Sequence, residues 1–522
     1  MFLRLEDLST EQKIGMVLCA RRCNNEADMT YTLELIRNHA VGCVQVPIND
    51  QTPAIVHAIR EAADYPVLII NDMEQGYPRA DLPKVSAMTL AACNSKEYLR
   101  AFARGIVATS QADGFSGTWC PVLDVLRCDG PCSVSRHFGD DPTKVSESAA
   151  EISRVFAEHG FVATGKHYPG GNDLPIDTHM AEGSSELTEK ELLEFDLVPY
   201  LNLMKQKLLP AIMTGHRVFP KIDPDRPASL SKPVIDIIRR QGFDGVAFTD
   251  SLAMMGILQK YGEENVMGMA VAAGNDIVLP NYRTSTKDCY EMLLKNYRDG
   301  AFTEERLNQA VCRVLALQRF VAEREANRVT LTDRDLECLN NVTRDCITAI
   351  TDEGVGASLG DPAARRLFVV LTELGFSEAN QAEITQGKWY FPNKIADKIR
   401  AEFPNSGVAF LPEFATAKDN DRVLTEATKY SEVVFVTFCT TSAYLGTDSL
   451  TRRAESLINA MIVSGKVSAI LHFGNPYAIK PIHHVPRRIF GYNAPESQTY
   501  AIEVLSGKIP ALGTLPFDIK FD

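Results

Sequence analysis

Short apolar runs recur along the first 330 residues, each four to eight residues long, as a strand buried on both faces requires. Between them lie stretches with apolar residues at helical spacing, such as Lys144–His159 and Glu189–Lys205. Strands that alternate with helices in this way predict an α/β fold, either a (β/α)8 TIM-like barrel or a doubly wound parallel sheet. The eight runs are Gly15–Ala20, Val41–Val46, Pro66–Ile70, Gly117–Val122, Phe161–Thr164, Ala211–Thr214, Gly245–Phe248 and Asp276–Leu279.

Polar and charged residues stand just after several of these runs. Ordinary loop charges would have no reason to repeat this position. In a barrel the carboxyl ends of all strands open on one mouth, where active sites are built. The placement therefore favours the barrel and predicts a site at its mouth. The residues concerned are Asp72, Glu74, Asp124, Lys166, His167, His216 and Asp250.

The pattern changes from about Thr330. Residues Leu331–Ile350 predict a connecting helix, and beyond it apolar runs again alternate with helical patterns such as Leu450–Val463. We therefore predict a barrel over residues 1–330, a connecting segment over 331–350 and a second α/β domain with a helix-covered parallel sheet over 351–522. The runs in this part are Leu367–Leu371, Val433–Phe438 and Val467–Phe473.

Length, charge and cysteine content narrow the class of protein. A chain of 522 residues is too long for one ordinary core, which agrees with two domains. Its net charge of −13 argues against nucleic acid or an anionic membrane surface as a partner. The N-terminus is charged where a signal peptide needs an apolar core, and no window holds the roughly 18 apolar residues of a membrane span. The 12 scattered cysteines contain no Cys-x-x-Cys pair, so we expect a cytoplasmic protein with reduced thiols.

The segment Gly165–His179 is the most informative part of the sequence. It follows a strand and holds two prolines, three glycines, two histidines, a lysine and two aspartates. Loops on a rigid scaffold often carry catalytic groups. Within it, Asp177 stands two residues before His179, so its carboxylate can orient the imidazole and favour the protonated ring. The pair is a candidate acid/base unit.

A second candidate is Asp250, which follows the apolar run Gly245–Phe248 and precedes a helix-like stretch. An aspartate at this position can simply cap the following helix. A glycosidase, however, needs a carboxylate at the sugar C1 to form a covalent intermediate, and the end of a barrel strand is a suitable place for one. From the residues alone, both interpretations of Asp250 stand.

Three motifs stand out in the barrel, namely Lys166–Gly170, Asp177–His179 and Phe248–Met254. Together they resemble the β-N-acetylglucosaminidase branch of the family 3 glycoside hydrolases. The resemblance implies a TIM-like barrel followed by a C-terminal α/β sandwich domain. Further similar segments in the barrel are Asn71–Gly76, Pro121–Val125, Ser135–Gly139 and Met213–His216, and those in the second domain are Gly474–Tyr477, Pro495–Ser497 and Gly507–Pro510.

The resemblance also implies a role for each residue of the site. Asp250 matches the nucleophile, His179 the general acid/base and Asp177 its orienting partner. The implied activity is that of a retaining exo-β-N-acetylglucosaminidase, which hydrolyses terminal β-linked N-acetylglucosamine without a metal or other cofactor. The residues that match the sugar-binding positions are Asp72, Arg79, Arg136, Lys166 and His167, and His216 is expected to line the same pocket.

Three other functions remain open. A phosphorylase of the same branch would use phosphate in place of water, and a histidine acid/base suits it because a carboxylate would repel the phosphate dianion. A β-glucosidase or a non-catalytic sugar-binding protein is also compatible with the barrel. The sequence departs from the branch at Gln75, Gly171 and Ser251. It therefore leaves open the natural aglycone (a muramic sugar, a chitin oligosaccharide or another glycan), as well as the oligomeric state.

Overall fold

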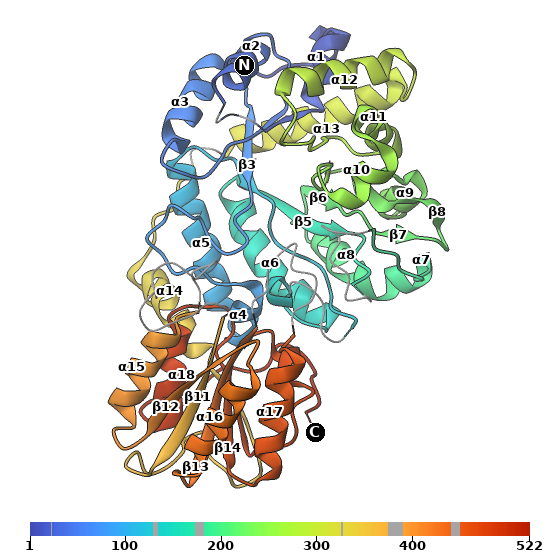
Figure 1. The fold of residues 1–522 in the computed structure, drawn as a ribbon. Helices are drawn as coiled ribbons and strands as arrows, with labels where there is room; N and C mark the ends of the chain where they lie inside the picture. The colour runs from blue at the N-terminus through green and yellow to red at the C-terminus, as the bar shows by residue number, and fades with distance from the viewer. Residues whose placement is uncertain are drawn as a thin grey trace. The chain divides into compact units, whose positions relative to one another are not determined.

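The computed structural model describes residues 1–21, 23, 25–128, 134–172, 182–324, 327–373, 390–439 and 449–521 (Figure 1). The chain divides into two compact units. Unit 1 comprises Met1–Leu82, Leu99–Cys128 and His137–Leu339, and unit 2 comprises Pro83–Tyr98, Asp129–Arg136 and Asn340–Asp522. The domain boundaries at residues 330 and 350 stay a prediction.

Unit 1 is built on a seven-stranded parallel sheet with the order β1-β2-β3-β4-β5-β6-β9. Helices follow the strands along the chain and surround the sheet in Figure 1, which confirms the predicted TIM-like barrel. The strands are β1 (Cys19–Ala20), β2 (Cys43–Gln45), β3 (Leu68–Asn71), β4 (Gly117–Thr118), β5 (Val162–Tyr168), β6 (Ala211–Thr214) and β9 (Val246–Thr249). A short antiparallel hairpin of β7 (Val218–Phe219) and β8 (Asp223–Pro227) stands apart from this sheet.

The helices of unit 1 alternate with these strands. They are α1 (Thr10–Met16), α2 (Glu26–Arg37), α3 (Thr52–Ala62), α6 (Pro142–Glu158), α7 (Glu189–Glu191), α8 (Val198–Lys205), α9 (Lys232–Arg240), α10 (Met255–Tyr261), α11 (Glu263–Ala273), α12 (Thr286–Arg298) and α13 (Glu304–Ala322). Helices α5 (Lys96–Ala112) and α14 (Asp333–Asp345) run along the chain from one unit into the other. In the described part of the chain, no helix is long and apolar enough to cross a membrane.

The eighth predicted strand, Asp276–Leu279, is not a strand in the structure. It forms single parallel bridges to each side, Phe248↔Ile277 and Leu18↔Val278. The backbone N–H of Val278 donates to the Val17 carbonyl at 2.9 Å, and the N–H of Cys19 donates to the Val278 carbonyl at 3.0 Å. The segment therefore takes the eighth position and links β9 back to β1, with too few ladder bonds to make a strand.

The first predicted strand, Gly15–Ala20, is also wrong over most of its length, because Gly15 and Met16 end helix α1. The helix begins at a capping box in which the Ser9 side chain accepts the Gln12 N–H and the Gln12 side chain accepts the Ser9 N–H. The predicted helix Glu189–Lys205 is broken into α7, a π-helical turn (Leu192–Asp196) and α8. Pro199 lies in the first turn of α8, where a proline is tolerated because the N–H that it lacks would have no partner within the helix.

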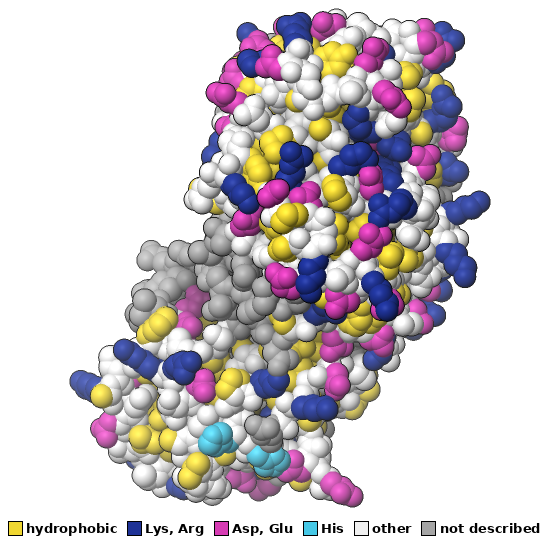
Figure 2. Space-filling view, turned by 90° about the vertical axis from the view of Figure 1, so that its right-hand side faces the viewer, with side chains coloured by type: hydrophobic (Ala, Val, Ile, Leu, Met, Phe, Trp, Pro, Cys, Tyr) yellow, Lys and Arg dark blue, Asp and Glu magenta, His cyan; other side chains and the backbone are white. Residues whose placement is uncertain are grey.

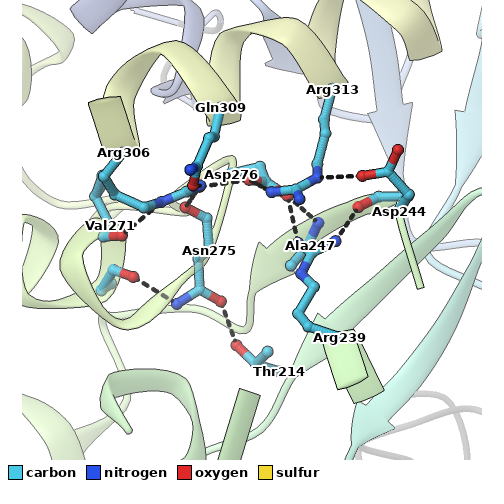
Figure 3. A network of polar contacts seen from close by, with 12 residues as sticks. Thr214, Arg239, Asp244, Ala247, Val271, Asn275, Asp276, Arg306, Gln309 and Arg313 are labelled. Atoms are coloured by element: carbon cyan, nitrogen blue, oxygen red, sulfur yellow. Dashed lines mark hydrogen bonds and ion pairs between the residues drawn. The ribbon is translucent and has the colours of Figure 1, made fainter. Parts of the chain in front are cut away.

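The buried carboxylate of Asp276, the first residue of the closing segment, anchors that segment (Figure 3). Asp276 is fully buried. Its Oδ2 accepts from Arg239 of α9 at 2.8 Å and from the Ala247 N–H at 2.9 Å. Its Oδ1 pairs with Arg306 and, at 3.3 Å, with Arg313, both from α13. One side chain thus ties two helices and β9 to the segment that closes the barrel.

We expect Asp276→Asn to lower the free energy of unfolding of the barrel by about 3–5 kcal/mol, since it leaves three guanidinium groups without their buried counter-charge. Urea unfolding can be followed by Trp119, which is buried in the barrel core, in a Trp389→Phe background. The matched control is Asp244→Asn, because Asp244 also binds Arg313 but is 89% exposed, so water can replace it. Equal unfolding midpoints for both variants would contradict the role of Asp276.

Unit 2 holds a six-stranded sheet with the order β10-β15-β14-β13-β11-β12, in which β10 pairs antiparallel with β15 and the other pairs are parallel. Its helices are α4 (Ala87–Ala92), α15 (Pro392–Glu402), α16 (Ala417–Ala427), α17 (Arg452–Val463) and α18 (Ser497–Ser506). The strands are β10 (Thr348–Thr351), β11 (Arg366–Thr372), β12 (Gly407–Pro412), β13 (Glu432–Cys439), β14 (Val467–Gly474) and β15 (Arg487–Phe490).

The second α/β domain is confirmed, with three predicted strands found as β11, β13 and β14. The predicted connecting helix over Leu331–Ile350 is shorter in the structure, because α14 ends at Asp345 and Thr348–Thr351 form strand β10. Strands β10, β12 and β15 were not predicted. Figure 2 shows Lys and Arg side chains interspersed with Asp and Glu side chains over the described residues of one face.

Candidate functional site

The carboxyl ends of four barrel strands bring the predicted residues of unit 1 to one mouth. Asp72 follows β3, Lys166 and His167 lie in the last part of β5, and Asp250 follows β9 directly. His216 stands two residues after β6. Parallel pairing places these strand ends side by side, since β5 pairs with β6 and β6 with β9. The predicted clustering of these residues therefore follows from the strand order.

Backbone hydrogen bonds hold Asp250 at its own N–H and at one oxygen of its carboxylate. Its N–H donates to the Thr214 carbonyl at 2.9 Å, and its Oδ1 accepts the Ser251 N–H at 2.6 Å. Its Oδ2 lies 3.8 Å from His167 Nε2. Burial acts to raise the pKa of Asp250, but the charges of His167 and His216, the Ser251 N–H and the charge of Lys166 outweigh it and hold that pKa well below its ordinary value. The carboxylate is therefore ionised at neutral pH, as a nucleophile requires.

His167 is fixed by Asp124, which the sequence analysis placed at the mouth without a role of its own. Its Nδ1 lies 2.7 Å from Asp124 Oδ2, and its backbone N–H donates to Asp124 Oδ1 at 3.1 Å. Burial acts to raise the pKa of Asp124, but the charge and hydrogen bonds of His167 lower it to about 2. Because an ionised carboxylate can only accept, Nδ1 carries the proton and Nε2 is the nitrogen that faces Asp250.

Lys166 is a buried cation between two carboxylates. Its side chain is 2% exposed, and its Nζ binds Asp72 and lies 2.5 Å from Glu74 Oε1. Asp72 is 55% exposed, so its carboxylate also reaches the open mouth. A paired ammonium and carboxylate of this kind offer charge-assisted bonds to sugar hydroxyls in a fixed arrangement.

His216 supports the backbone next to Asp250. It is buried, its Nε2 donates to the Ser251 carbonyl at 3.0 Å and its Nδ1 lies 2.8 Å from Ser229 Oγ. Since a carbonyl can only accept, Nε2 carries a proton. These bonds fix the ring against Ser251, the residue that follows the nucleophile candidate.

The other predicted residues are placed as follows. Arg79 donates from Nε to Asp113 Oδ2 at 2.9 Å and from Nη1 to the Asn49 carbonyl at 2.7 Å. Arg136 ends a short 3-10 helix, Val134–Arg136, which is part of unit 2. Asp177 and His179 lie outside the described residues. Their predicted roles remain predictions.

Arg21 is a member of this mouth that the sequence analysis missed. It follows β1 directly, as Asp250 follows β9, so the rule that found the other residues also applies to it. Its guanidinium donates to Gln45 at the end of β2 and to Ser251 beside Asp250. Among the described residues, no group of histidine, cysteine or acidic side chains is arranged to hold a metal ion.

The barrel sequence matches a known family model. Residues 9–317 match the glycosyl hydrolase family 3 N terminal domain, which is more than half of the chain. The chain belongs to glycosyl hydrolase family 3. The resemblance seen in the motifs is thereby confirmed at the level of the family.

Two curated relatives are similar to part of this chain. A β-N-acetylglucosaminidase/β-glucosidase of Cellulomonas fimi is 26% identical over 332 residues, which cover 60% of this chain and 58% of the relative. The chain thus spans less than two thirds of that relative. A β-hexosaminidase of Idiomarina loihiensis (strain ATCC BAA-735 / DSM 15497 / L2-TR) is 30% identical over 240 residues, which cover 44% of this chain and 72% of the relative.

A solved family 3 structure has the same fold over both units. It is a β-N-acetylglucosaminidase from Paenibacillus sp. str. FPU-7, with a TM-score of 0.79 and 24% sequence identity. The likeness covers 99% of this chain and 100% of the other. The barrel and the C-terminal α/β domain therefore occur together in the family as they do here.

Proposed function

We propose that this protein is a retaining exo-β-N-acetylglucosaminidase that releases terminal β-linked N-acetylglucosamine through a covalent glycosyl-enzyme intermediate. The observation that carries the proposal is the ionised Asp250 carboxylate at the end of β9, fixed by the Ser251 N–H and facing His167. A carboxylate so placed can attack the sugar C1. The Cellulomonas fimi relative is named as a β-N-acetylglucosaminidase/β-glucosidase and the Idiomarina loihiensis relative as a β-hexosaminidase, and the first of these names supports N-acetylglucosamine as the sugar.

In this proposal the remaining residues bind the sugar or transfer protons. Lys166 with Asp72 and Glu74 binds hydroxyls of the sugar and sets the ring for attack. His179, oriented by Asp177, protonates the leaving oxygen and then takes the proton from the incoming water. An imidazole suits both steps near neutral pH because its ordinary pKa lies close to that pH. We place the reaction in the cytoplasm, in keeping with the free thiols of all 11 cysteines among the described residues.

Charge at the mouth favours water over phosphate as the acceptor. Among the described residues placed at the strand ends above, four carboxylates (Asp72, Glu74, Asp124 and Asp250) stand against two permanently cationic side chains, Lys166 and Arg21. A phosphate dianion approaching Asp250 meets net repulsion, whereas water does not. Hydrolysis is therefore the proposed outcome, and phosphorolysis is the alternative that the experiment must separate.

We expect free N-acetylglucosamine, released first as the β-anomer, to be the main product even in millimolar phosphate. Proton NMR of the products identifies both the anomer and any sugar 1-phosphate. Aryl N-acetyl-β-glucosaminide and aryl β-glucoside should be compared, each with and without phosphate. Accumulation of the 1-phosphate with a kcat that rises with phosphate would show a phosphorylase. Faster turnover of the glucoside would show a β-glucosidase, and release of the α-anomer would exclude the retaining mechanism.

A further inference from the structure

Arg21 connects three parts of the barrel mouth. Its Nε donates to Gln45 Oε1 at 2.6 Å, and its Nη1 donates to Ser251 Oγ at 2.8 Å and to the Pro280 carbonyl at 2.7 Å. These partners belong to the end of β2, to the residue after Asp250 and to the residue after the closing segment Asp276–Leu279. A planar guanidinium can hold three such acceptors in fixed directions, which a lysine ammonium cannot do.

Ser251 is the partner that reaches the reacting carboxylate. It is fixed at three points: its Oγ accepts from Arg21, its carbonyl accepts from His216 at 3.0 Å, and its N–H donates to Asp250 Oδ1 at 2.6 Å. Two further backbone bonds hold the same turn, from the Leu252 N–H to the Leu279 carbonyl at 3.0 Å and from the Met254 N–H to the Ser251 carbonyl at 3.1 Å. The Arg21 bond holds the Ser251 side chain, so its loss loosens the residue whose N–H points at Oδ1. With Oδ1 occupied, Oδ2 is left on the side of His167, 3.8 Å from its Nε2.

Arg21 carries its charge in a largely buried position, which disfavours the charged form. Burial lowers the pKa of Arg21, while Cys19 and the carboxylates of Asp250 and Asp72 act in the opposite direction. The guanidinium also lies over the ring of Tyr282, 5.4 Å from its centroid, and Arg283 lies over the same ring at 4.4 Å. Arg283 is thus a second guanidinium next to Tyr282, and its replacement is a matched control for loss of positive charge.

We propose that Arg21 is a positioning residue for Asp250, acting through Ser251 and its backbone N–H. The inference rests on the proposed role of Asp250 as nucleophile. Arg21 does not itself take part in bond making: it holds the carboxylate in the orientation from which Oδ2 can attack. Its loss should therefore lower the rate of the glycosylation step and leave ground-state binding of the sugar nearly unchanged.

The test is a double-mutant cycle on the full-length enzyme with an aryl N-acetyl-β-glucosaminide. We expect Arg21→Gln to reduce kcat by about 10- to 100-fold with KM changed less than about threefold, the size of effect that a small misplacement of a reacting group produces. Ser251→Ala should reduce kcat less, because its N–H remains. The double variant should be no slower than Arg21→Gln alone, since both changes break the same connection. Arg21→Lys, which keeps the charge without the fork, should resemble Arg21→Gln, and Arg283→Gln should resemble the wild type.

Three results would overturn the inference: a kcat for Arg21→Gln within twofold of the wild type, a loss confined to KM, or losses that multiply in the double variant. Should Arg21→Gln fail to fold, Arg21→Lys and Ser251→Ala give the same comparison. Failure of this inference can be distinguished from failure of the proposed function. If Asp250→Asn is inactive and Arg21→Gln is not, only the positioning role fails, whereas an active Asp250→Asn variant removes the nucleophile itself.

Discussion

Replacement of Asp250 by Asn should reduce kcat by roughly three orders of magnitude or more on every substrate, because the amide cannot form the glycosyl-enzyme bond. The fold should survive, since Asn can still accept the Ser251 N–H and has nearly the same volume. Turnover of an aryl N-acetyl-β-glucosaminide and thermal unfolding of the same preparation give the two measurements. Loss of activity with an unchanged unfolding temperature is the expected result.

Asp244→Asn is the matched control for this change. Asp244 lies just before β9 and Asp250 just after it, so the same substitution is made at the two ends of one strand. The control should keep full activity. A mechanism-based fluorosugar should label Asp250, and a peptide map that places the label on another carboxylate, such as Asp72 or Glu74, would refute the assignment.

The buried parallel strands could be predicted from the sequence because their runs are apolar on both faces. All residues of β11 and nearly all of β13 and β14 are buried, and these strands were found. Strand β12 lies at the edge of its sheet and is only partly buried, and its apolar run, Val408–Leu411, is short and was not predicted as a strand. The closing segment of the barrel has an apolar run like the strands, but its backbone makes only one bridge to each neighbour. An apolar run shows that a segment is buried and does not show how many backbone bonds it makes.

The sequence predicted which residues stand at the strand ends, but not which partners their side chains contact. Asp72, Lys166, His167, His216 and Asp250 come together because they lie at or just after the carboxyl ends of strands in one parallel sheet. What each side chain contacts depends on its reach and its partners. His167 turns to Asp124, and Arg79 turns to Asp113 and Asn49. Arg21 was missed because no motif marks it, although its place after β1 is the same signal.

His179→Ala should separate substrates by their leaving groups. An aryl group with a low pKa leaves with little protonation, so glycosylation from such a substrate should be slowed least. Release of an unactivated sugar needs the proton, and a β-linked disaccharide of N-acetylglucosamine should react about 10²–10⁴-fold more slowly than with the wild type. The ratio of kcat/KM values for the two substrates, in wild type and variant, is the quantity to measure.

The pH dependence of kcat/KM is an independent test of His179 as the general acid, because the direction of the change can be predicted. A general acid must be protonated, so kcat/KM for the disaccharide should fall as pH rises through the pKa of His179, and this alkaline limb should be absent in His179→Ala. Asp250 cannot supply that limb, because its pKa lies below the ordinary value and the carboxylate stays ionised throughout. Asp177→Asn should move the limb to lower pH, since it removes the charge that favours the protonated ring. Equal losses on both substrates, with the alkaline limb retained, would show that His179 is structural and that the acid is another residue.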